Sequence, residues 1–328
     1  NREYANNDFN ESQTLFSARL TPRIGVEWMD KNRLIVGVDL LQNFGDDTKF
    51  LSKARPSAYY QFNSRNVQAN AGIFDRKELL GDYSLAFFGD STAFYHNRLS
   101  GFLGHYKSTE RRNTYVEMAI DWEGMYSTLS REKFRILLAG RHYLDTFYYG
   151  FNYSMFHYAG QQGAPIENVV DLQLLNPCVG VRFNAFFDFD IKLGALLTAQ
   201  RDRSFGHSWE KPCMGEFAFR ISRWGLSLDE RLYVGDNIHP FFYGHELEDG
   251  TPLPYGRELY PAESFFRTDQ KVYSRTALSY RRSFFDDTVS VRAEFAAHHD
   301  GTALGTQQML VVGVKLLKTV YNSKNHKK

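Results

Sequence analysis

The chain of 328 residues has few cysteines and no long apolar run. No stretch approaches the roughly 18 consecutive apolar residues of a transmembrane helix, so a helical membrane protein is excluded. Cys178 and Cys213 are expected to start two strands separated by another strand, so we expect isolated thiols, with a disulfide as the alternative. The 39 basic residues nearly balance the 38 acidic ones, which gives no reason to expect nucleic acid as a partner.

Aromatic residues are abundant, with 28 Phe, 20 Tyr and 4 Trp, although the mean hydropathy is −0.45. This combination is typical of a chain in which apolar residues occupy every second position. The clearest example is the stretch 271–299, in which two arms with alternating apolar and polar residues flank Asp286-Asp287. Side chains alternate between the two faces of a strand, so the stretch predicts a hairpin. Each arm is longer than an ordinary globular strand and matches the roughly 9–11 residues of a transmembrane strand.

The same alternation recurs along the whole chain and predicts about fifteen strands. Short turns are expected near Asp30, Ser64, Ser108, Tyr143, Phe189, Trp224 and Asp286. Long connections are expected at 76–97, 157–176 and 235–269. Short turns on one side and long loops on the other predict an all-β fold, a transmembrane antiparallel up-and-down β-barrel with short periplasmic turns and long extracellular loops. A β-sandwich or a propeller also alternates, but their strands are shorter.

The direction of the first visible strand helps to predict the number of strands in the barrel. Barrels of this kind have an even number of strands with both termini on the periplasmic side, and the first visible strand runs the wrong way for a first strand. We therefore expect about sixteen strands, with 14 or 18 as alternatives, and we expect that the given sequence lacks the first of them. Residues 1–328 are expected to form a single domain, with a loop at 1–14, a long extracellular loop at 235–269 and a polar C-terminal tail at 319–328.

Two sets of side chains are candidates for functional positions. Aromatic residues near strand ends are expected at the membrane–water interfaces, namely Trp28, Phe62, Trp122, Trp224 and Phe284. Charged residues on the polar face are expected to line the lumen and contact solutes, namely Arg135, Arg141, Arg182, Arg220, Arg231, Arg275, Arg292, Glu117, Asp121 and Glu294. The alternative for the charged set is that its members pair across strands and stabilise the barrel.

Several segments resemble porin-like outer-membrane β-barrel proteins of Bacteroidota. They are Asn1-Arg2-Glu3-Tyr4, Gln13-Thr14-Leu15-Phe16, Leu20-Thr21-Pro22-Arg23, Gly72-Ile73-Phe74-Asp75-Arg76, Asp90-Ser91 with Tyr95, and Asp121-Trp122-Glu123-Gly124. The resemblance implies the fold and a location in the bacterial outer membrane, but no substrate. The tail beyond Tyr321 departs from the aromatic strand end of many such barrels.

The chain lacks the local motifs of common enzymes and cofactor sites, including Gly-x-Ser-x-Gly, a phosphate loop, His-Glu-x-x-His and Cys-x-x-Cys. We therefore expect no enzymatic activity, no cofactor and no metal. Neighbouring His298 and His299 would point to opposite faces, and Asp188-Phe189-Asp190 is interpreted as a turn rather than a cation site.

These observations favour a porin-like channel for small polar or anionic solutes. The alternatives are a non-transporting subunit of an outer-membrane assembly or surface-glycan complex, and a barrel-embedded hydrolase. The expected partners are outer-membrane lipid and lipopolysaccharide, with other outer-membrane proteins or lipoproteins as further candidates. The aromatics of loop 235–269 predict that it packs into the barrel mouth, with Glu246, Glu248 and Asp249 near the basic wall.

Overall fold

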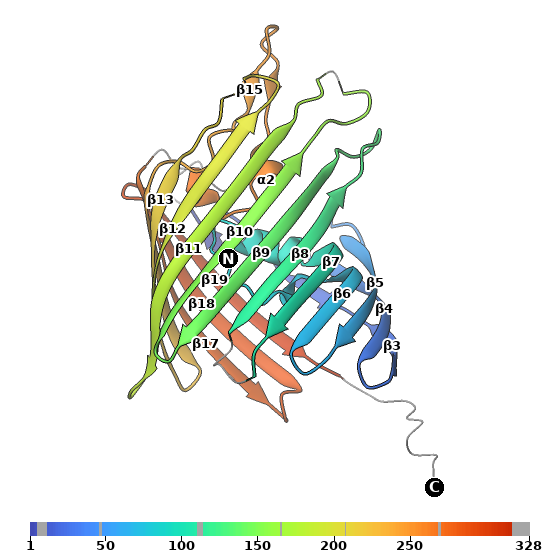
Figure 1. Cartoon of the computed structure of the whole chain (residues 1–328), viewed down its shortest axis with the longest axis vertical. Coiled ribbons are helices and arrows are strands. Elements are labelled where there is room, and N and C mark those ends of the chain that lie inside the picture. Colours follow the sequence, from blue (N-terminus) through green and yellow to red (C-terminus); the bar gives the residue numbers. More distant parts are fainter. Residues whose placement is uncertain are drawn as a thin grey trace.

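A large antiparallel sheet dominates the computed structural model, which describes residues 1–4, 12–45, 48–109, 114–164, 166–206, 208–267 and 270–316. Its strands run alternately up and down (Figure 1). The seventeen strands of this sheet are β1 (Arg2–Glu3), β2 (Ser17–Leu20), β3 (Arg23–Trp28), β4 (Asn32–Asn43), β5 (Lys53–Asn63), β6 (Val67–Asp75), β7 (Arg98–Lys107), β8 (Tyr115–Gly124), β9 (Lys133–Leu144), β10 (Phe147–Tyr158), β11 (Val170–Asn184), β12 (Asp188–Asp202), β13 (Cys213–Arg223), β14 (Leu226–Gly235), β17 (Val272–Phe284), β18 (Val289–His299) and β19 (Leu304–Val314).

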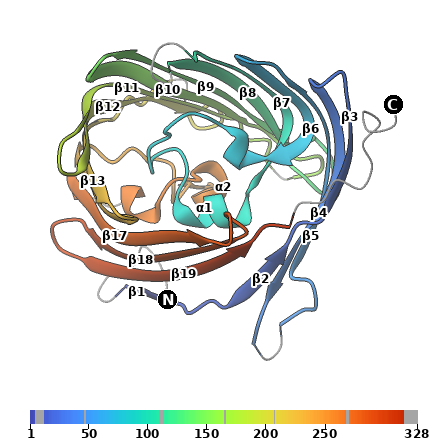
Figure 2. The same cartoon turned by 90° about the horizontal axis from the view of Figure 1, so that it is seen from below.

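Each long strand pairs with the strands of this sheet that come before and after it in the chain, and β14 pairs with β17 because β15 and β16 form a separate hairpin. Strands β2 and β3 pair with successive parts of β4, so the seventeen strands occupy sixteen positions. Strand β1 pairs with β19, and Arg2 also forms a bridge to Gln13 just before β2. The sheet curves round on itself and encloses the short helices α1 (Asp90–Tyr95) and α2 (Gly256–Leu259) (Figure 2). The predicted all-β, up-and-down barrel fold is confirmed.

The predicted hairpin at 271–299 is formed by β17 and β18. Residues 285–287 of its turn have positive φ angles of 55°, 51° and 63°. Aspartate tolerates this left-handed region better than most residues, which suits Asp286 and Asp287 to the turn.

The turn predicted at Asp188-Phe189-Asp190 is wrong, because these residues begin β12 and the turn lies at 185–187. Phe189 stacks across the strands on Phe183, with ring centroids 4.9 Å apart, and Asp190 pairs with Arg182. The alternation of faces therefore continues through residues whose local composition indicated a turn.

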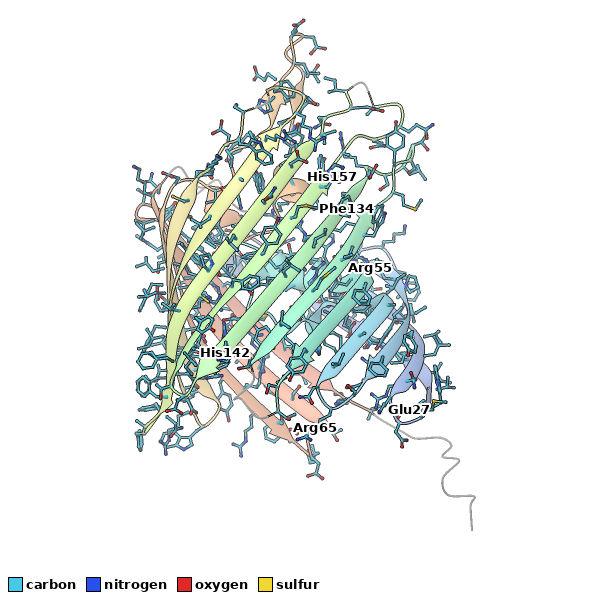
Figure 3. All side chains as sticks on the ribbon, viewed as in Figure 1. Glu27, Arg55, Arg65, Phe134, His142 and His157 are labelled. Carbon is cyan, nitrogen blue, oxygen red and sulfur yellow. The ribbon has the colours of Figure 1, made fainter. Side chains whose placement is uncertain are left out.

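The outer face of the wall carries an exposed apolar belt (Figure 3). Its members include Leu20, Ile24, Val26, Leu34, Val36, Val179, Leu193, Leu197, Leu278, Phe295 and Leu310. An apolar outer surface of this kind faces lipid in transmembrane barrels.

The interface aromatics divide between the two rims. Trp28, Phe62, Trp224 and Phe284 lie at the side of the short turns (the turn side), and Trp122 lies near the opposite end of its strand, at the side of the long loops (the loop side). Tyr143, which also follows the pattern of a rim residue, instead lies on the inner face, where its hydroxyl meets Arg141.

Two long connections fold into the barrel. Segment 76–97 contains η1 (Arg76–Glu78) and α1, and segment 236–271 contains β15 (His245–Glu246), β16 (Pro252–Leu253), α2 and η2 (Ser264–Arg267). Their buried apolar side chains pack on those of the wall and on one another, and include Leu85, Phe87, Phe241, Phe242, Tyr255, Leu259, Tyr260, Phe265 and Phe266.

Packing of loop 235–269 into the barrel mouth is thereby confirmed. Its acids lie elsewhere than predicted, because Glu246, Glu248 and Asp249 are exposed on the hairpin of β15 and β16. The carboxylate that meets a basic wall residue is Glu258, 2.6 Å from Lys133. No helix in the described part of the chain is long and apolar enough to cross a membrane.

Candidate functional site

A cavity of about 830 Å³ lies at the loop side of the barrel between α1, α2 and the ends of β5 to β9. We call it the rim pocket. Its volume is that of pockets that bind small organic ligands. It is lined by Lys53, Arg55, Pro56, Ile73, Arg76, Phe88, Ser91, Thr92, Tyr95, His96, Arg98, Ser100, Asp121, Trp122, Glu123, Lys133, Arg257, Glu258 and Pro261.

Basic side chains predominate in the rim pocket, with six lysines and arginines against three acids. Arg76 and Lys133 pair with Asp121 and Glu258, at 2.7 and 2.6 Å. Lys53 and Arg55 form no ion pair with a described residue. The Arg55 guanidinium donates to the backbone oxygen of Tyr95 at 3.0 Å, and Lys53 lies over the Tyr95 ring. These two cations give the pocket an excess of positive charge that favours an anionic ligand.

Two further arginines, Arg76 and Arg98, line the rim pocket. The Arg76 Nε donates to the backbone oxygen of His96 at 3.0 Å, and Arg98 is paired with Asp75 at 2.7 Å. Arg98 is buried, and its Nε and Nη2 have no hydrogen-bond partner among the described residues; the same holds for Nη1 of Arg76. Buried donors without partners are uncommon, and here they add to the positive potential of the pocket.

His96 is the one histidine of the rim pocket lining and follows the C-terminus of α1. Its backbone N–H donates to Thr92 O at 2.8 Å, which fixes its place at the end of the helix. Desolvation, together with the positive charges of Arg55 and Lys53, lowers the pKa of His96. The imidazole is therefore neutral at pH 7 and can accept a proton. Ser91, on α1, supplies a hydroxyl to the same pocket.

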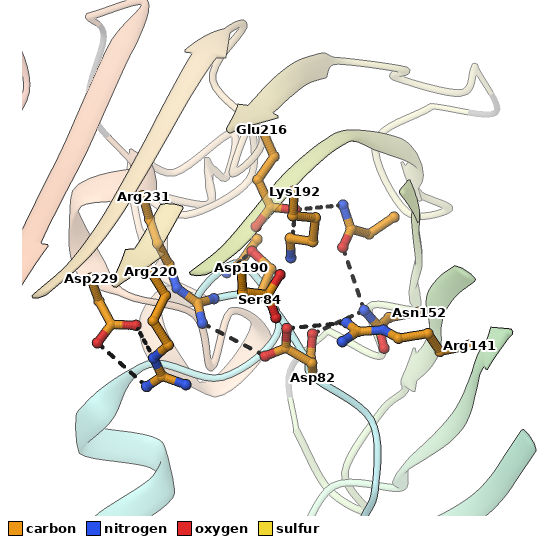
Figure 4. A network of polar contacts seen from close by, with 12 residues as sticks. Asp82, Ser84, Arg141, Asn152, Asp190, Lys192, Glu216, Arg220, Asp229 and Arg231 are labelled. Atoms are coloured by element: carbon orange, nitrogen blue, oxygen red, sulfur yellow. Dashed lines mark hydrogen bonds and ion pairs between the residues drawn. The ribbon is translucent and has the colours of Figure 1, made fainter. Parts of the chain in front are cut away.

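Below the rim pocket, a polar network ties segment 76–97 to the inner wall (Figure 4). Asp82 lies at its centre, 3.2 Å from Arg141 and 3.6 Å from Arg231, and its backbone oxygen accepts from Asn152 at 3.1 Å. Desolvation inside the barrel opposes ionisation of Asp82, although 47% of its side chain remains exposed, but Arg231, Lys192 and Arg141 outweigh this and hold its pKa well below the usual range. Asp82 therefore stays ionised and anchors the segment inside the lumen.

All ten predicted lumen residues lie on the inner face of the wall. Arg141 and Arg231 share Asp82, Arg275 contacts Asp90 and Glu294, and Asp121 contacts Arg76. The remaining contacts are Arg135–Glu123, Arg182–Asp190, Arg220–Asp229, Arg292–Glu294, and Glu117 with the backbone N–H groups of Leu80 and Gly81. Pairing of the wall charges is therefore confirmed, and part of it joins the wall to segment 76–97.

The rim pocket brings together residues that the alternation did not identify. Lys53 and Arg55 lie just before the apolar core of β5, and Arg98 starts β7. The parity of Arg55 with Ser57 and Tyr59, both buried on the inner face, is a signal that could have identified it. His96 carries no such signal, because its place depends on where segment 76–97 folds.

The remaining site predictions concern cysteine and histidine. Cys178 is buried inside β11, not at the start of a strand as predicted, whereas Cys213 is exposed at the start of β13; both are free thiols, as expected. His298 is buried against Tyr273, whereas His299 is exposed, in agreement with the predicted opposite faces. Within the described ranges, no group of three or more His, Cys, Asp or Glu residues could hold a metal ion.

Comparison with known proteins gives one family. The profile of the lipid A 3′-O-deacylase-type family matches residues 1–210. The chain belongs to the lipid A 3′-O-deacylase-type family. No curated protein matches the chain.

Solved structures of barrels are similar at low sequence identity. A mutant of Rh. blastica porin has a TM-score of 0.47 and 10% identity, covering 94% of both chains. OpdL of Pseudomonas aeruginosa has a TM-score of 0.43 and 11% identity over 95% of both chains. OmpT of Vibrio cholerae has a TM-score of 0.48 and 10% identity over 93% of both chains.

The family membership corrects one prediction. We expected no enzymatic activity because local motifs are absent, but the matched family is a family of enzymes, so this prediction is wrong. The physical reason is that a barrel assembles a site from loops and strand ends far apart in sequence, which no short motif reports. The location in the bacterial outer membrane and the up-and-down β-barrel fold are confirmed.

Proposed function

We propose that the protein hydrolyses an O-acyl ester of lipid A or a closely related phosphorylated, acylated sugar, and that the rim pocket binds the sugar. The observation that carries the proposal is the excess of unpaired cations around a neutral histidine at the loop side of the barrel. Family membership supplies the reaction class, an acyl ester hydrolysis. The loop side faces the extracellular leaflet, in which lipid A resides.

Different residues of the rim pocket have different roles in this reaction. Arg55 and Lys53 bind a phosphate or stabilise the negative charge that develops on the ester oxygen. His96 accepts the proton of the attacking water, because its lowered pKa keeps it neutral at physiological pH. The apolar side chains of Ile73 and Phe88 contact the first part of the acyl chain.

The test is acyl release from lipid A by the purified protein in vesicles, measured by mass spectrometry of the remaining lipid and the free fatty acid. His96→Gln should lower the rate about 10²- to 10⁴-fold, the usual contribution of a general base. Arg55→Gln should raise the KM more than it lowers kcat. The matched control is His142→Gln, because His142 lies on β9 near the turn side, away from the rim pocket.

Two results would contradict the proposal. One is a folded wild-type protein that releases no fatty acid, and the other is a His96→Gln variant with the wild-type rate. Ser91→Ala refines the chemistry: a loss as large as that of His96→Gln would make the Ser91 hydroxyl the attacking group in place of water.

Passive passage of small polar or anionic solutes is the second candidate. It is favoured by the exposed side chains of Arg182 and Arg220 in the turn-side part of the lumen. We rank it second because segments 76–97 and 236–271 fill the middle of the lumen with packed side chains. Planar-bilayer conductance tests it: an open pore whose anion preference falls in Arg182→Gln and Arg220→Gln variants supports it, and absence of conductance contradicts it.

A further inference from the structure

An unbroken row of side chains crosses the outside of five neighbouring strands at the loop side. Its members are directly opposite one another across the strands: Trp122 on β8, Phe134 on β9, His157 on β10, Asp171 on β11 and Arg201 on β12. We call this the outer row. Figure 3 shows Phe134 and His157 next to each other near the loop-side ends of their strands. Trp122 also lines the rim pocket, whereas Phe134, His157, Asp171 and Arg201 are not part of its lining.

The first half of the outer row is aromatic. The rings of Trp122 and Phe134 stack with centroids 5.2 Å apart and planes 10° from parallel. The Phe134 and His157 rings follow at 5.1 Å. Trp122 remains 46% exposed, so the row presents ring surface to the outside. Flat aromatic surface of this kind binds the apolar faces of sugar rings.

The second half of the outer row is charged. Asp171 accepts from Nε of Arg201 at 2.8 Å and from Nε and Nη2 of Arg203 at 2.8 and 2.9 Å, and His157 lies 3.7 Å away. The Arg201 guanidinium also lies 4.6 Å from the Trp209 ring centroid. The Nη groups of Arg201 and Nη1 of Arg203 form no hydrogen bond with any described residue. Asp171 thus holds two arginines side by side and leaves some of their guanidinium N–H groups available. This arrangement is suited to binding phosphate.

The position of the outer row relative to the apolar belt indicates what it faces. Strands β10, β11 and β12 continue from the row toward the turn side. Four residues along, their outer face carries Tyr153, Leu175 and Leu197. After four more residues it carries Tyr149, Val179 and Leu193. Val179 and Leu193 are 56% and 57% exposed. The loops begin directly above the row. The row therefore lies at the border between hydrocarbon and headgroups of the outer leaflet.

We propose that the outer row binds the phosphorylated headgroup of an outer-leaflet glycolipid. The phosphate contacts Arg201 and Arg203, and the sugar lies against His157 and Phe134. Strands lie about 4.8 Å apart, so Phe134 and Arg201 are about 14 Å apart along the row, a span that suits a phosphorylated sugar better than a single phosphate ion. This site is on the outside of the barrel and shares only Trp122 with the lining of the rim pocket, and it binds lipid whether or not that lipid is hydrolysed.

Native mass spectrometry of the delipidated protein in detergent tests the site, with lipid A carrying two phosphates as the probe. The parent protein for this test carries His96→Gln, so that hydrolysis does not consume the probe, and Lys53→Gln/Arg55→Gln, so that lipid A bound in the rim pocket does not add to the readout. The double variant Arg201→Gln/Arg203→Gln should weaken binding about tenfold or more, because charge-assisted hydrogen bonds are lost. Phe134→Ala should weaken it several-fold.

The matched control is Arg282→Gln, because Arg282 also lies on the outer face, over an aromatic ring, but at the turn side. It should bind lipid A like the parent protein. Dephosphorylated lipid A should bind as weakly to the parent as lipid A does to the double variant, and inorganic phosphate should not compete.

Three results would overturn the proposal. They are equal binding by the parent and the double variant, equal loss in Arg282→Gln, and equally tight binding of phosphatidylglycerol, which would make the row a general anionic-lipid site. A heat-dependent gel shift identical to that of the parent protein shows that each variant has folded.

Discussion

Two ion pairs on neighbouring strands occupy different parts of the lumen. Lys192 on β12 and Glu216 on β13 lie 3.2 Å apart with 3% and 0% of their side chains exposed. Arg220 on β13 and Asp229 on β14 lie 2.7 Å apart, but are 55% and 19% exposed. The charged atoms of Arg220 and Asp229 are closer together than those of Lys192 and Glu216. Their electrostatic attraction is nevertheless weaker, because water screens exposed charges and leaves buried ones unscreened.

The difference arises from the two inserted segments. Glu216 also accepts hydrogen bonds from Asn176 at 2.9 Å and from Tyr233 at 3.2 Å, and the Tyr233 hydroxyl meets Ser84 of segment 76–97 at 3.0 Å. Segment 76–97 and the apolar residues around Phe266 therefore turn the middle of the lumen into protein interior. The turn-side part, in which Arg220 is 55% exposed, keeps a solvated wall.

The largest effect is expected from breaking the enclosed pair. Glu216→Gln leaves the buried ammonium of Lys192 without its ion-pair partner, so the free energy of unfolding should fall by about 3–5 kcal/mol. Urea unfolding of the reconstituted barrel, followed by tryptophan fluorescence, measures it. Replacing both partners, as in Lys192→Met/Glu216→Leu, removes the orphaned charge and should restore much of the stability. If the double variant were as unstable as Glu216→Gln, the buried charge of Lys192 would not be the cause of the lost stability.

The strands of the barrel wall could be predicted from the sequence, because the alternation of apolar and polar residues that identifies them is local. The parity of residues 271–299 predicted β17, β18 and the turn at Asp286-Asp287, and the two strands pair as expected. One face of each strand contacts lipid and the other faces the lumen. The polarity of each residue therefore indicates the face on which it lies. The aromatics of loop 235–269 likewise predicted burial, because they need an apolar partner.

The inserted segment 76–97 and the rim pocket could not be predicted in this way. Leu85, Ala86 and Phe87 form a continuous apolar run without a period, and their partners, such as Tyr233 and Phe266, lie far along the chain. His96 meets Arg55 only because α1 folds into the mouth of the barrel. The site therefore depends on tertiary contacts between loops, and an absence of local motifs said nothing about it.

A smaller effect on stability, and a clear effect on passage through the lumen, is expected at Asp82. Asp82→Asn removes the shared partner of Arg141 and Arg231, but its side chain is 47% exposed, so the loss should be only about 1 kcal/mol. The more sensitive readout is planar-bilayer conductance, which should rise as segment 76–97 loosens. In the wild type, the lowered pKa of Asp82 means that its anchoring is complete above the ordinary aspartate pKa of about 4 and is lost as the pH falls through the lowered value.

Conductance of the wild type should therefore stay low from pH 8 to about 4 and rise only below it. Asp82→Asn should conduct at every pH. Glu230→Gln is the control, because Glu230 lies on the outer face and contacts Ser274 there. A conductance of Asp82→Asn equal to that of the wild type at neutral pH would show that other contacts hold the segment.

The smallest effect is expected in the open half of the lumen. Arg220→Gln breaks the closer of the two ion pairs, yet the free energy of unfolding should change by less than about 1 kcal/mol, because both partners regain solvation. Raising the salt from 0.05 to 1 M shortens the screening length to about 3 Å and should abolish even this difference. The difference between Glu216→Gln and the wild type should persist in 1 M salt, since no ions enter the packed middle. A loss at Arg220 of 2 kcal/mol or more, or one that salt leaves unchanged, would place the Arg220–Asp229 pair in an enclosed environment and would remove the distinction between the two halves of the lumen.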